Sequence, residues 1–463
     1  ISAALPLSKF DELGVEYYFK VTDDAGNSDT TAIGYTYRSY TSKNFSIVNA
    51  PYTGTANSYR VISNPYILES NRISKIFADY GSSGNQSWRL FNYFNGGYQE
   101  LGTSSSNMEP GTGYWFNKVE SLSQSIVLDN ARAPQHNKDN LFNMLLRKGW
   151  NLISNPYPFE LSWNDVLAEN GLAPGNLKLF TFSSGYREAT KLNEFEGGFV
   201  FAESQTTIRI PVVNKTGSGA RISAAESEGY EWLVNISLDN RQTSNNLGAI
   251  GMHLDAEKSY DIYDTPVLPN PGEFPDIHFS HEEHFSGAFI RDIAPLSEQY
   301  FWEFDAFTPA FTGKATAHVL TWNGVFSLPP GKKLVMYDLM ADIRIDMQST
   351  DSYSFTTDKP ATFKVIYGDA SFVNEALEKL QISAPLPYPN PFKDYINFPV
   401  RLPYSVRRYS AELKVQNLMG NKVFTTVSEF EGGSISNLTW ESAIENLSPG
   451  IYIYNIEIKN GHL

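Results

Sequence analysis

Three histidines lie close together near the middle of the chain, at His278, His281 and His284, with Glu282 and Glu283 between the last two. Imidazole and carboxylate groups are common ligands of transition metals. Only two residues separate His281 from His284, so the spacing differs from the His-Glu-x-x-His pattern of zinc enzymes. We therefore favour a solvated polar loop and keep His281 and His284 as weak candidates for a metal site.

Four acidic residues stand at short intervals just upstream, at Asp255, Glu257, Asp261 and Asp264. Their carboxylate oxygens are the hard ligands that Ca²⁺ prefers. The spacing does not follow the loop of an EF-hand, which makes calcium between two sheets a weak alternative. We expect the chain to need no cofactor.

Several kinds of chemistry are excluded by residues that are missing. The sequence has no cysteine, so it has no disulfide, thiolate nucleophile, cysteine-based zinc site or iron–sulfur cluster. Serine-nucleophile elbows, phosphate-binding glycine loops and dinucleotide motifs are also absent. Carboxylates are plentiful, but no pair stands out as an acid and a base. We expect no enzyme activity within this chain, although a catalytic domain could lie upstream.

Charge and hydropathy restrict the partners. A formal net charge of −15 opposes binding to nucleic acid or to an anionic membrane surface. No apolar run approaches the roughly 18 residues of a membrane span. The first residues also lack the basic start and apolar stretch of a signal peptide, which predicts either a cytoplasmic protein or a trimmed N-terminus.

Aromatic side chains near glycine turns could stack on sugars. Trp88, Tyr98, Tyr114 and Trp115 are the candidates for a shallow glycan groove. The alternative is that these rings fill the core of a small β-domain, because aromatic residues are also typical of strands. We favour the alternative, since every neighbouring position has a structural explanation.

A five-residue phrase occurs twice and predicts an internal repeat. Ile62–Tyr66 reads Ile-Ser-Asn-Pro-Tyr, and Ile153–Tyr157 repeats it letter for letter. Aromatic segments and glycine-rich segments follow each copy in the same order, at 88–93 and 177–182, then at 110–116 and 196–201. We therefore assign residues 43–134 and 135–222 to two β repeats.

Each repeat is expected to run strand, Asn-Pro break, short helix, strand, glycine turn, strand. Proline cannot donate to a strand ladder, and glycine lets the chain turn tightly. The helices are predicted over Ser70–Asp79, with Ser70 or Asn71 as the cap, and over Ser162–Asn170, with Ser162 as the cap and Gly171 as the stop.

The flanking segments complete the domain plan. Residues 17–28 alternate into the turn Asp-Asp-Ala-Gly-Asn, which is typical of the last hairpin of an immunoglobulin-like or fibronectin-like sandwich. We therefore assign residues 1–42 to the tail of a truncated domain of that kind. Residues 223–370 are predicted to be a β-sandwich. We call it acidic because residues 229–384 carry a net charge of −12. Residues 371–384 are predicted to be a linker or a short helix.

The last segment, residues 385–463, reads as a compact β-sandwich with a dense set of ordered motifs. The motifs fall into four groups: Tyr388, Pro389, Asn390, Pro391 and Phe392; Met419, Gly420 and Lys422; Trp440; and Pro449, Gly450, Ile451 and Tyr452. Taken together, they resemble the type A C-terminal sorting domain of cargo proteins of the bacterial type IX secretion system. In that family a final strand and a basic tail normally follow a turn such as 459–461, so we expect the last strand to be missing here.

The resemblance implies a route and a set of partners. A protein of this kind crosses the periplasm and the outer membrane, and its sorting domain is received by a translocon and an outer-membrane shuttle barrel. A sortase-like peptidase then usually removes the domain at the cell surface.

The sequence as a whole predicts an all-β protein of tandem β-sandwich domains, immunoglobulin-like or jelly-roll-like, with a few short helices. We expect a non-catalytic part of a secreted surface protein whose upstream domains act as a stalk or as adhesive modules. The alternative is a set of glycan-binding modules of a secreted polysaccharide-degrading enzyme or protease, and surface glycans are candidate partners in either case.

Overall fold

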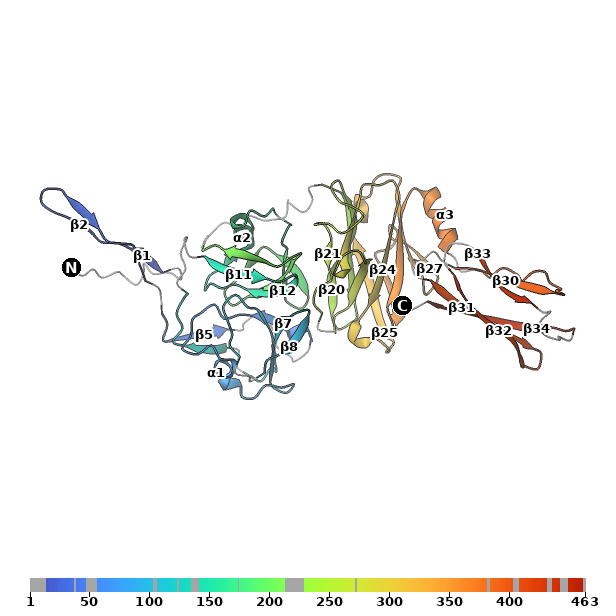
Figure 1. The fold of residues 1–463 in the computed structure, drawn as a ribbon, viewed down its shortest axis with the longest axis horizontal. Coiled ribbons are helices and arrows are strands. Elements are labelled where there is room, and N and C mark those ends of the chain that lie inside the picture. The colour runs from blue at the N-terminus through green and yellow to red at the C-terminus, as the bar shows by residue number, and fades with distance from the viewer. Residues whose placement is uncertain are drawn as a thin grey trace. The chain divides into compact units, whose positions relative to one another are not determined.

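The computed structural model consists mostly of strands, with three short helices among the described residues, which confirms the all-β prediction (Figure 1). The chain divides into two compact units, and each is described by itself. The first unit contains residues 1–296, 305–324 and 352–360, and the second contains residues 297–304, 325–351 and 361–463. The structure describes residues 14–36, 39–46, 56–102, 106–122, 125–134, 141–173, 175–212, 229–270, 273–380, 384–402, 408–430, 435–441 and 449–460.

The N-terminal segment forms the predicted hairpin. Its strands are β1 (Val15–Tyr17), β2 (Lys20–Thr22), β3 (Ser28–Thr30) and β4 (Gly34–Thr36), and they pair β2 with β3 and β1 with β4. Asp23 holds the turn, because its Oδ1 accepts hydrogen bonds from the backbone N–H groups of Ala25 and Asn27. The membership of this hairpin in an immunoglobulin-like domain stays a prediction.

Residues 42–129 form a module that we call the first module. It contains β5 (Ser42–Ser46), η2 (Ala56–Ser58), β6 (Arg60–Ile62), α1 (Ile73–Ile76), η3 (Ala78–Tyr80), β7 (Trp88–Phe94), β8 (Gly97–Glu100), β9 (Tyr114–Lys118) and β10 (Ser125–Asp129). Four strands form a sheet in the order β6-β9-β7-β8, and β5 pairs with β10. The helix buries Ile73 and Ile76 in the core beneath the sheet.

Residues 142–210 form the second module. It contains β11 (Phe142–Leu146), β12 (Gly149–Ser154), β13 (Leu161–Ser162), α2 (Trp163–Glu169), β14 (Leu179–Phe182), β15 (Tyr186–Ala189), β16 (Lys191–Leu192), β17 (Gly197–Ala202) and β18 (Thr206–Ile210). Its four-stranded sheet has the order β12-β17-β14-β15, and β11 pairs with β18. If β12, β17, β14 and β15 are matched to β6, β9, β7 and β8, the two sheets have the same strand order.

The Asn-Pro break after the first sheet strand of each module is held by a buried asparagine. Asn64 accepts a hydrogen bond from Tyr66 N at 3.1 Å and donates to Tyr66 O at 3.0 Å. Asn155 accepts from Tyr157 N at 2.9 Å and donates to Phe159 O at 2.6 Å. The side-chain amide thus satisfies backbone groups that have left the ladder, which explains the asparagine as well as the proline.

The two helices begin differently. Ser162 caps α2, because its Oγ accepts a hydrogen bond from Asp165 N at 3.3 Å, and Gly171 follows the helix at a φ of +65°, both as predicted. The predicted cap of α1 is wrong: Arg72 occupies that position and makes no side-chain cap bond. Asn71 instead accepts a hydrogen bond from Leu68 N, so its side chain serves the preceding turn.

The two modules contact each other through reciprocal backbone pairing. Ser63 N donates to Phe195 O, and Ser154 N donates to Gly111 O, each at 3.0 Å. Glycine permits this approach, since a Cβ on Gly113 would lie 2.5 Å from the carbonyl oxygen of Ile153, and a Cβ on Gly197 would lie 2.6 Å from a methyl group of Val61. Gly113 and Gly197 are thus needed for close contact between the modules, whereas Gly111, with a φ of +80°, is a turn glycine as the sequence suggested.

The remainder of the first unit is a sheet in the order β22-β23-β20-β19-β25-β28, with β21 paired to β23. The strands are β19 (Tyr230–Asp239), β20 (Ser244–His253), β21 (Thr265–Pro266), β22 (Asp276–His281), β23 (Gly287–Pro295), β25 (Thr316–Asn323) and β28 (Ser352–Thr357), and η4 spans Pro309–Phe311. In β19, alternate residues are buried, at Trp232, Val234, Ile236 and Leu238, as expected for a strand with one face in a core.

The second unit begins with four strands in the order β27-β26-β29-β24. Their bounds are β24 (Tyr300–Phe307), β26 (Lys333–Asp338), β27 (Ile343–Asp346) and β29 (Ala361–Gly368), and η5 spans Val325–Ser327. The segment predicted as a linker is mostly the helix α3 (Ala370–Leu380). Its apolar residues Val373, Ala376, Leu377 and Leu380 share one cluster with side chains of β26 and β29, so the predicted linker belongs to a core.

Residues 384–460 form two small antiparallel sheets around a single core. The strands are β30 (Tyr395–Arg401), β31 (Tyr409–Asn417), β32 (Lys422–Phe430), β33 (Ile435–Glu441) and β34 (Tyr452–Asn460). One sheet pairs β30 with β33, and the other has the order β32-β31-β34. The predicted β-sandwich is therefore present, and residues 461–463, which bear on the expected final strand, lie outside the described residues.

Candidate recognition sites

Trp440 is the centre of the C-terminal sandwich. The indole is buried in β33 and contacts three rings: Phe392 at 5.2 Å, Phe424 at 5.6 Å and Tyr452 at 5.5 Å between centroids. Offset and edge-on pairs of this kind stabilise a core beyond the area they bury. Residues from three of the four predicted motif groups therefore meet at Trp440.

The first motif group is tied to the sandwich at Tyr388. Tyr388 and Asn397 exchange both backbone hydrogen bonds, at 3.0 Å and 2.8 Å, which anchors the segment beside β30. Pro389, Asn390 and Pro391 then run exposed along the surface, before Phe392 turns inward. The peptide bonds before both prolines are cis.

The second motif group forms the turn between β31 and β32. Asn417 Oδ1 accepts hydrogen bonds from Met419 N at 3.0 Å and from Asn421 N at 2.9 Å, and Gly420 has a φ of +79°. The asparagine side chain thus fixes the turn while glycine permits its conformation. Met419 and its neighbour Leu418 point away from the core.

The turn lies next to the fourth motif group because β31 pairs with β34. Asn417 is directly opposite Tyr452 in this register. Three apolar side chains at this end are largely exposed: Leu418 at 67%, Met419 at 82% and Ile451 at 70%. Pro449, Gly450 and Lys422 are exposed there as well. Apolar groups gathered at one exposed end are a feature of interaction surfaces.

The four residues proposed for a glycan groove do not gather in one groove, although Tyr98 and Trp115 line a cavity of about 240 Å³. Trp88 is stacked on Phe77 inside the first module, and Tyr114 lies in the same core. Trp115 is buried between the two modules, and Tyr98 is half-buried with its hydroxyl donating to Pro269 O at 2.9 Å. Trp88, Tyr114 and Trp115 are buried, so the faces of their rings are not available to a sugar.

The predicted histidine cluster is divided between two networks. His281 is buried, with its Nδ1 2.9 Å from Glu283 and its Nε2 3.6 Å from Asp292. Burial alone would lower the pKa of His281, but the nearby charge of Asp292 and the hydrogen bond with Glu283 raise it to about 9. His284 instead contacts Glu203 of the second module at 3.0 Å. The predicted solvated loop is therefore wrong for His281, whose side chain is buried.

The four acidic candidates line one cavity of about 640 Å³, together with Glu203 and Tyr260. Two of the four accept protein hydrogen bonds: Asp261 accepts from Glu257 N and Tyr263 N, and Asp264 accepts from Ile293 N and Asp261 N. Burial, with the nearby charge of Asp292, raises the pKa of Asp264 to about 7. In the described ranges, no three His, Asp or Glu side chains come together in a way that could hold a metal ion.

Comparison with known proteins decides the identity of the C-terminal sandwich. Residues 387–463 match the family model described as "Secretion system C-terminal sorting domain". The chain carries a type IX sorting domain. A search of curated proteins finds no match to this chain.

The sorting domain implies a protein that is secreted or displayed at the cell surface and that interacts with the type IX machinery. No helix in the described part of the chain is long and apolar enough to cross a membrane. Within the sorting domain, the motif residues divide into two roles: Trp440, Phe392 and Tyr452 build the core, whereas Met419, Lys422 and Ile451 are available to a partner.

Leu418 belongs to the motif segment Val415–Gly420, but the sequence did not single it out as a recognition residue. Leu418 lies beside Met419 at the same turn and is nearly as exposed. Leu418 and Met419 are adjacent apolar residues in a tight turn, where they have no core to pack against. Apolar residues at such an exposed position indicate an interaction surface.

Proposed function

We propose that this chain is the non-catalytic part of a cell-surface protein that the type IX machinery delivers through the sorting domain. The observation that carries the proposal is the match over residues 387–463. The domains before it act as a stalk and as adhesive modules, and the shared strand order of the first and second modules supports tandem copies of one unit.

The route leads through the periplasm and the outer membrane, with a translocon, a shuttle barrel and a sortase-like peptidase as the partners. Within the sorting domain, we place recognition at the exposed end formed by Leu418, Met419 and Ile451. These side chains are apolar, lie at one end of the β32-β31-β34 sheet, and contribute little to the core around Trp440. A partner that covers them gains hydrophobic burial without unfolding the domain.

Deletion of residues 384–463 tests the delivery step. We expect the truncated protein to stay in the periplasm, as measured by cell fractionation and by protease shaving of intact cells. Normal surface delivery of the truncated protein would refute the proposal.

A sharper test separates recognition from folding. The variant Leu418→Ser, Met419→Ser, Ile451→Ser should fold but reach the surface less efficiently, by roughly tenfold if the apolar end contributes a typical interface hot spot. Val427→Ser with Ile435→Ser is the matched control, because these residues are also exposed and apolar but lie elsewhere on the domain. Equal delivery of both variants would place recognition on another surface.

A further inference from the structure

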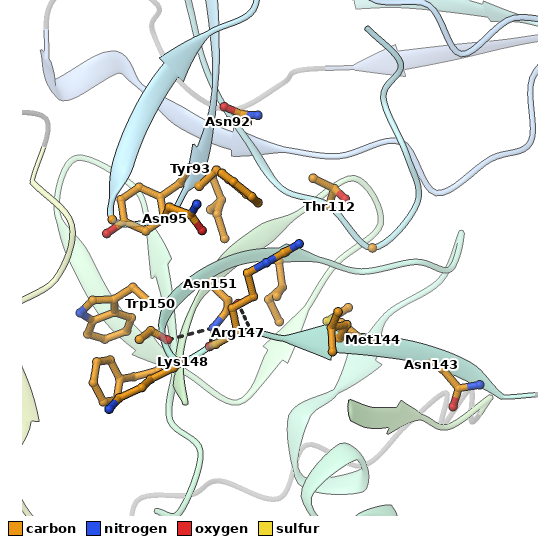
Figure 2. Close-up of a pocket in the computed structure, with 18 of the residues that line it drawn as sticks. Asn92, Tyr93, Asn95, Thr112, Asn143, Met144, Arg147, Lys148, Trp150 and Asn151 are labelled. Atoms are coloured by element: carbon orange, nitrogen blue, oxygen red, sulfur yellow. Dashed lines mark hydrogen bonds between the residues drawn. The ribbon is translucent and has the colours of Figure 1, made fainter. Parts of the chain in front are cut away.

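A groove of about 540 Å³ lies where the first and second modules meet the loop between β22 and β23. The hairpin tip of β7 and β8 contributes Tyr93, Phe94 and Asn95, and the second module contributes the turn between β11 and β12. Figure 2 shows Arg147, Lys148 and Trp150 among the residues that line the groove. The groove is within the size range of ordinary ligand sites.

The groove is positively charged although the chain is acidic. Its lining includes Arg147 and Lys148 but no aspartate or glutamate among the described residues. Arg147 lies over the ring of Phe94 at 4.7 Å, and Lys148 lies over the ring of Phe285 at 3.9 Å. Other exposed cations of the second module, such as Lys191 and Arg209, face carboxylates at 2.5 Å. Within the described residues, neither cation of the groove has a carboxylate partner.

The two cations are held in place by their own turn. Asn151 accepts a hydrogen bond from Arg147 N at 2.8 Å and donates to the carbonyl oxygens of Arg147 and Gly149 at 2.7 Å and 2.9 Å. Gly149 has a φ of +91°, which a side chain would disfavour. The turn is therefore fixed before any ligand arrives, which lowers the entropic cost of binding.

Amide and aromatic groups complete the lining. The Oδ1 atom of Asn92 is buried there without a hydrogen-bond partner, while Asn95 and Asn143 are exposed. Trp150 is half-buried, and its indole N–H donates to Val267 O at 2.8 Å, so the ring is held in one orientation. The groove thus combines rigid rings, free amides and two cations.

We propose that this groove binds an acidic saccharide that bears carboxylate or sulfate groups. A carboxylate or sulfate matches the unpaired guanidinium and ammonium, hydroxyls match the amides, and the apolar face of a sugar ring packs on Tyr93 or Trp150. The inference rests on the proposed adhesive role and names its ligand class.

The test is affinity electrophoresis of the purified full chain in gels containing polygalacturonate, chondroitin sulfate or dextran. We expect retardation by at least one acidic polymer and none by neutral dextran, and the two acidic gels distinguish a carboxylate from a sulfate ligand. Arg147→Gln with Lys148→Gln should weaken the apparent Kd by roughly tenfold or more, because both charge-assisted contacts are lost. Phe94→Ala, a change at an exposed ring, should weaken binding without changing the charge.

Lys191→Gln with Arg209→Gln is the matched control, since it removes the same charge from the same module outside the groove. The inference would be overturned if the control variant lost as much retardation as the double groove variant. It would also be overturned if the unmodified chain bound dextran as well as the acidic polymers, bound neither acidic polymer, or bound DNA more tightly. Because binding is measured on purified protein and delivery is measured in cells, failure of either proposal can be recognised separately.

Discussion

The second module forms one wall of two cavities that differ in charge and in how that charge is satisfied. The groove is lined by two cations and no carboxylate, whereas the acidic cavity is lined by Glu203, Asp255, Glu257, Asp261 and Asp264. In the acidic cavity, backbone N–H groups bind Asp261 and Asp264, and Tyr260 and His284 bind Glu203. In the part of the chain that the structure describes, the two cations of the groove and the Oδ1 atom of Asn92 have no such partners. Charge that the protein satisfies internally indicates a structural role, and charge that it leaves open indicates a ligand.

The strongest test of this comparison removes the wall that both cavities share. Trp150 lines both of them and contacts Phe180, Phe199 and Phe201. We expect Trp150→Ala to lower the free energy of unfolding by about 3 kcal/mol, because the change opens a cavity and leaves Val267 O without its donor. Chemical denaturation measures this value. Phe94→Ala is the control, since its exposed ring should matter far less; equal losses would mean that Trp150 is not a shared wall.

The next effect concerns His281, whose charge is met by the neighbouring carboxylates Glu283 and Asp292. The folded-state pKa of His281 is about 9, above its ordinary value of 6.5, so the folded protein holds this proton more tightly than the unfolded chain. The resulting stabilisation is complete below pH 6.5 and is lost as the pH rises through 9, by at most about 3 kcal/mol. Denaturation series between these pH values measure the fall.

The histidine variants check the source of that fall. His281→Gln should remove most of the pH dependence between 6.5 and 9, whereas His278→Gln should retain it. An unchanged slope in His281→Gln would assign the effect to other groups.

A smaller effect is expected at the helix next to the acidic cavity. Asn170 and Leu172, at the end of α2, line that cavity. Loss of the cap in Ser162→Ala should cost about 1 kcal/mol of unfolding free energy, whereas Ser70→Ala, near the uncapped α1, should cost much less. Saccharide binding in the groove should be unchanged in both variants. A loss of binding in Ser162→Ala would couple the two cavities.

The smallest expected effect is that of calcium. Because no three carboxylate or imidazole groups of the described residues gather at one point, millimolar Ca²⁺ should leave the Tm unchanged. Differential scanning fluorimetry with Mg²⁺ as the control measures this. A clear rise of Tm with Ca²⁺ alone would restore the acidic cavity as a metal site.

The sequence predicted those strands and helices whose formation depends on residues within the element itself. The alternation in β19 and the pair Ser162 and Gly171 around α2 are signals within one element. The helix α3 was only half recognised, although Val373, Ala376, Leu377 and Leu380 have helical spacing. The cap of α1 was wrong because Asn71 could serve either the helix or the preceding turn, and propensity does not decide between them.

The sites could likewise be predicted only where their residues are close together in the sequence. Each sorting-domain motif is a short stretch of sequence, and the family match over residues 387–463 confirms the domain that the motifs indicate. The groove could not be predicted, because Tyr93, Arg147 and Phe285 are far apart in sequence and meet only after the modules pack. The burial of Trp88, Tyr114 and Trp115 agrees with the core interpretation that we favoured over a glycan groove. The type of residue alone does not distinguish the two, because aromatic residues beside glycine occur in cores and in grooves.

The exchange of hydrogen bonds between Ser63 and Phe195 and between Ser154 and Gly111 has the form of an isologous contact, in which each half gives what it receives. A symmetric homodimer makes the same contact between separate chains. The two modules are thus arranged like the two subunits of a dimer within one chain. Either module expressed alone would expose the glycine-containing backbone that contacts the other module, at Gly111 and Gly113 or at Gly197. Its best partner would then be a second copy of itself.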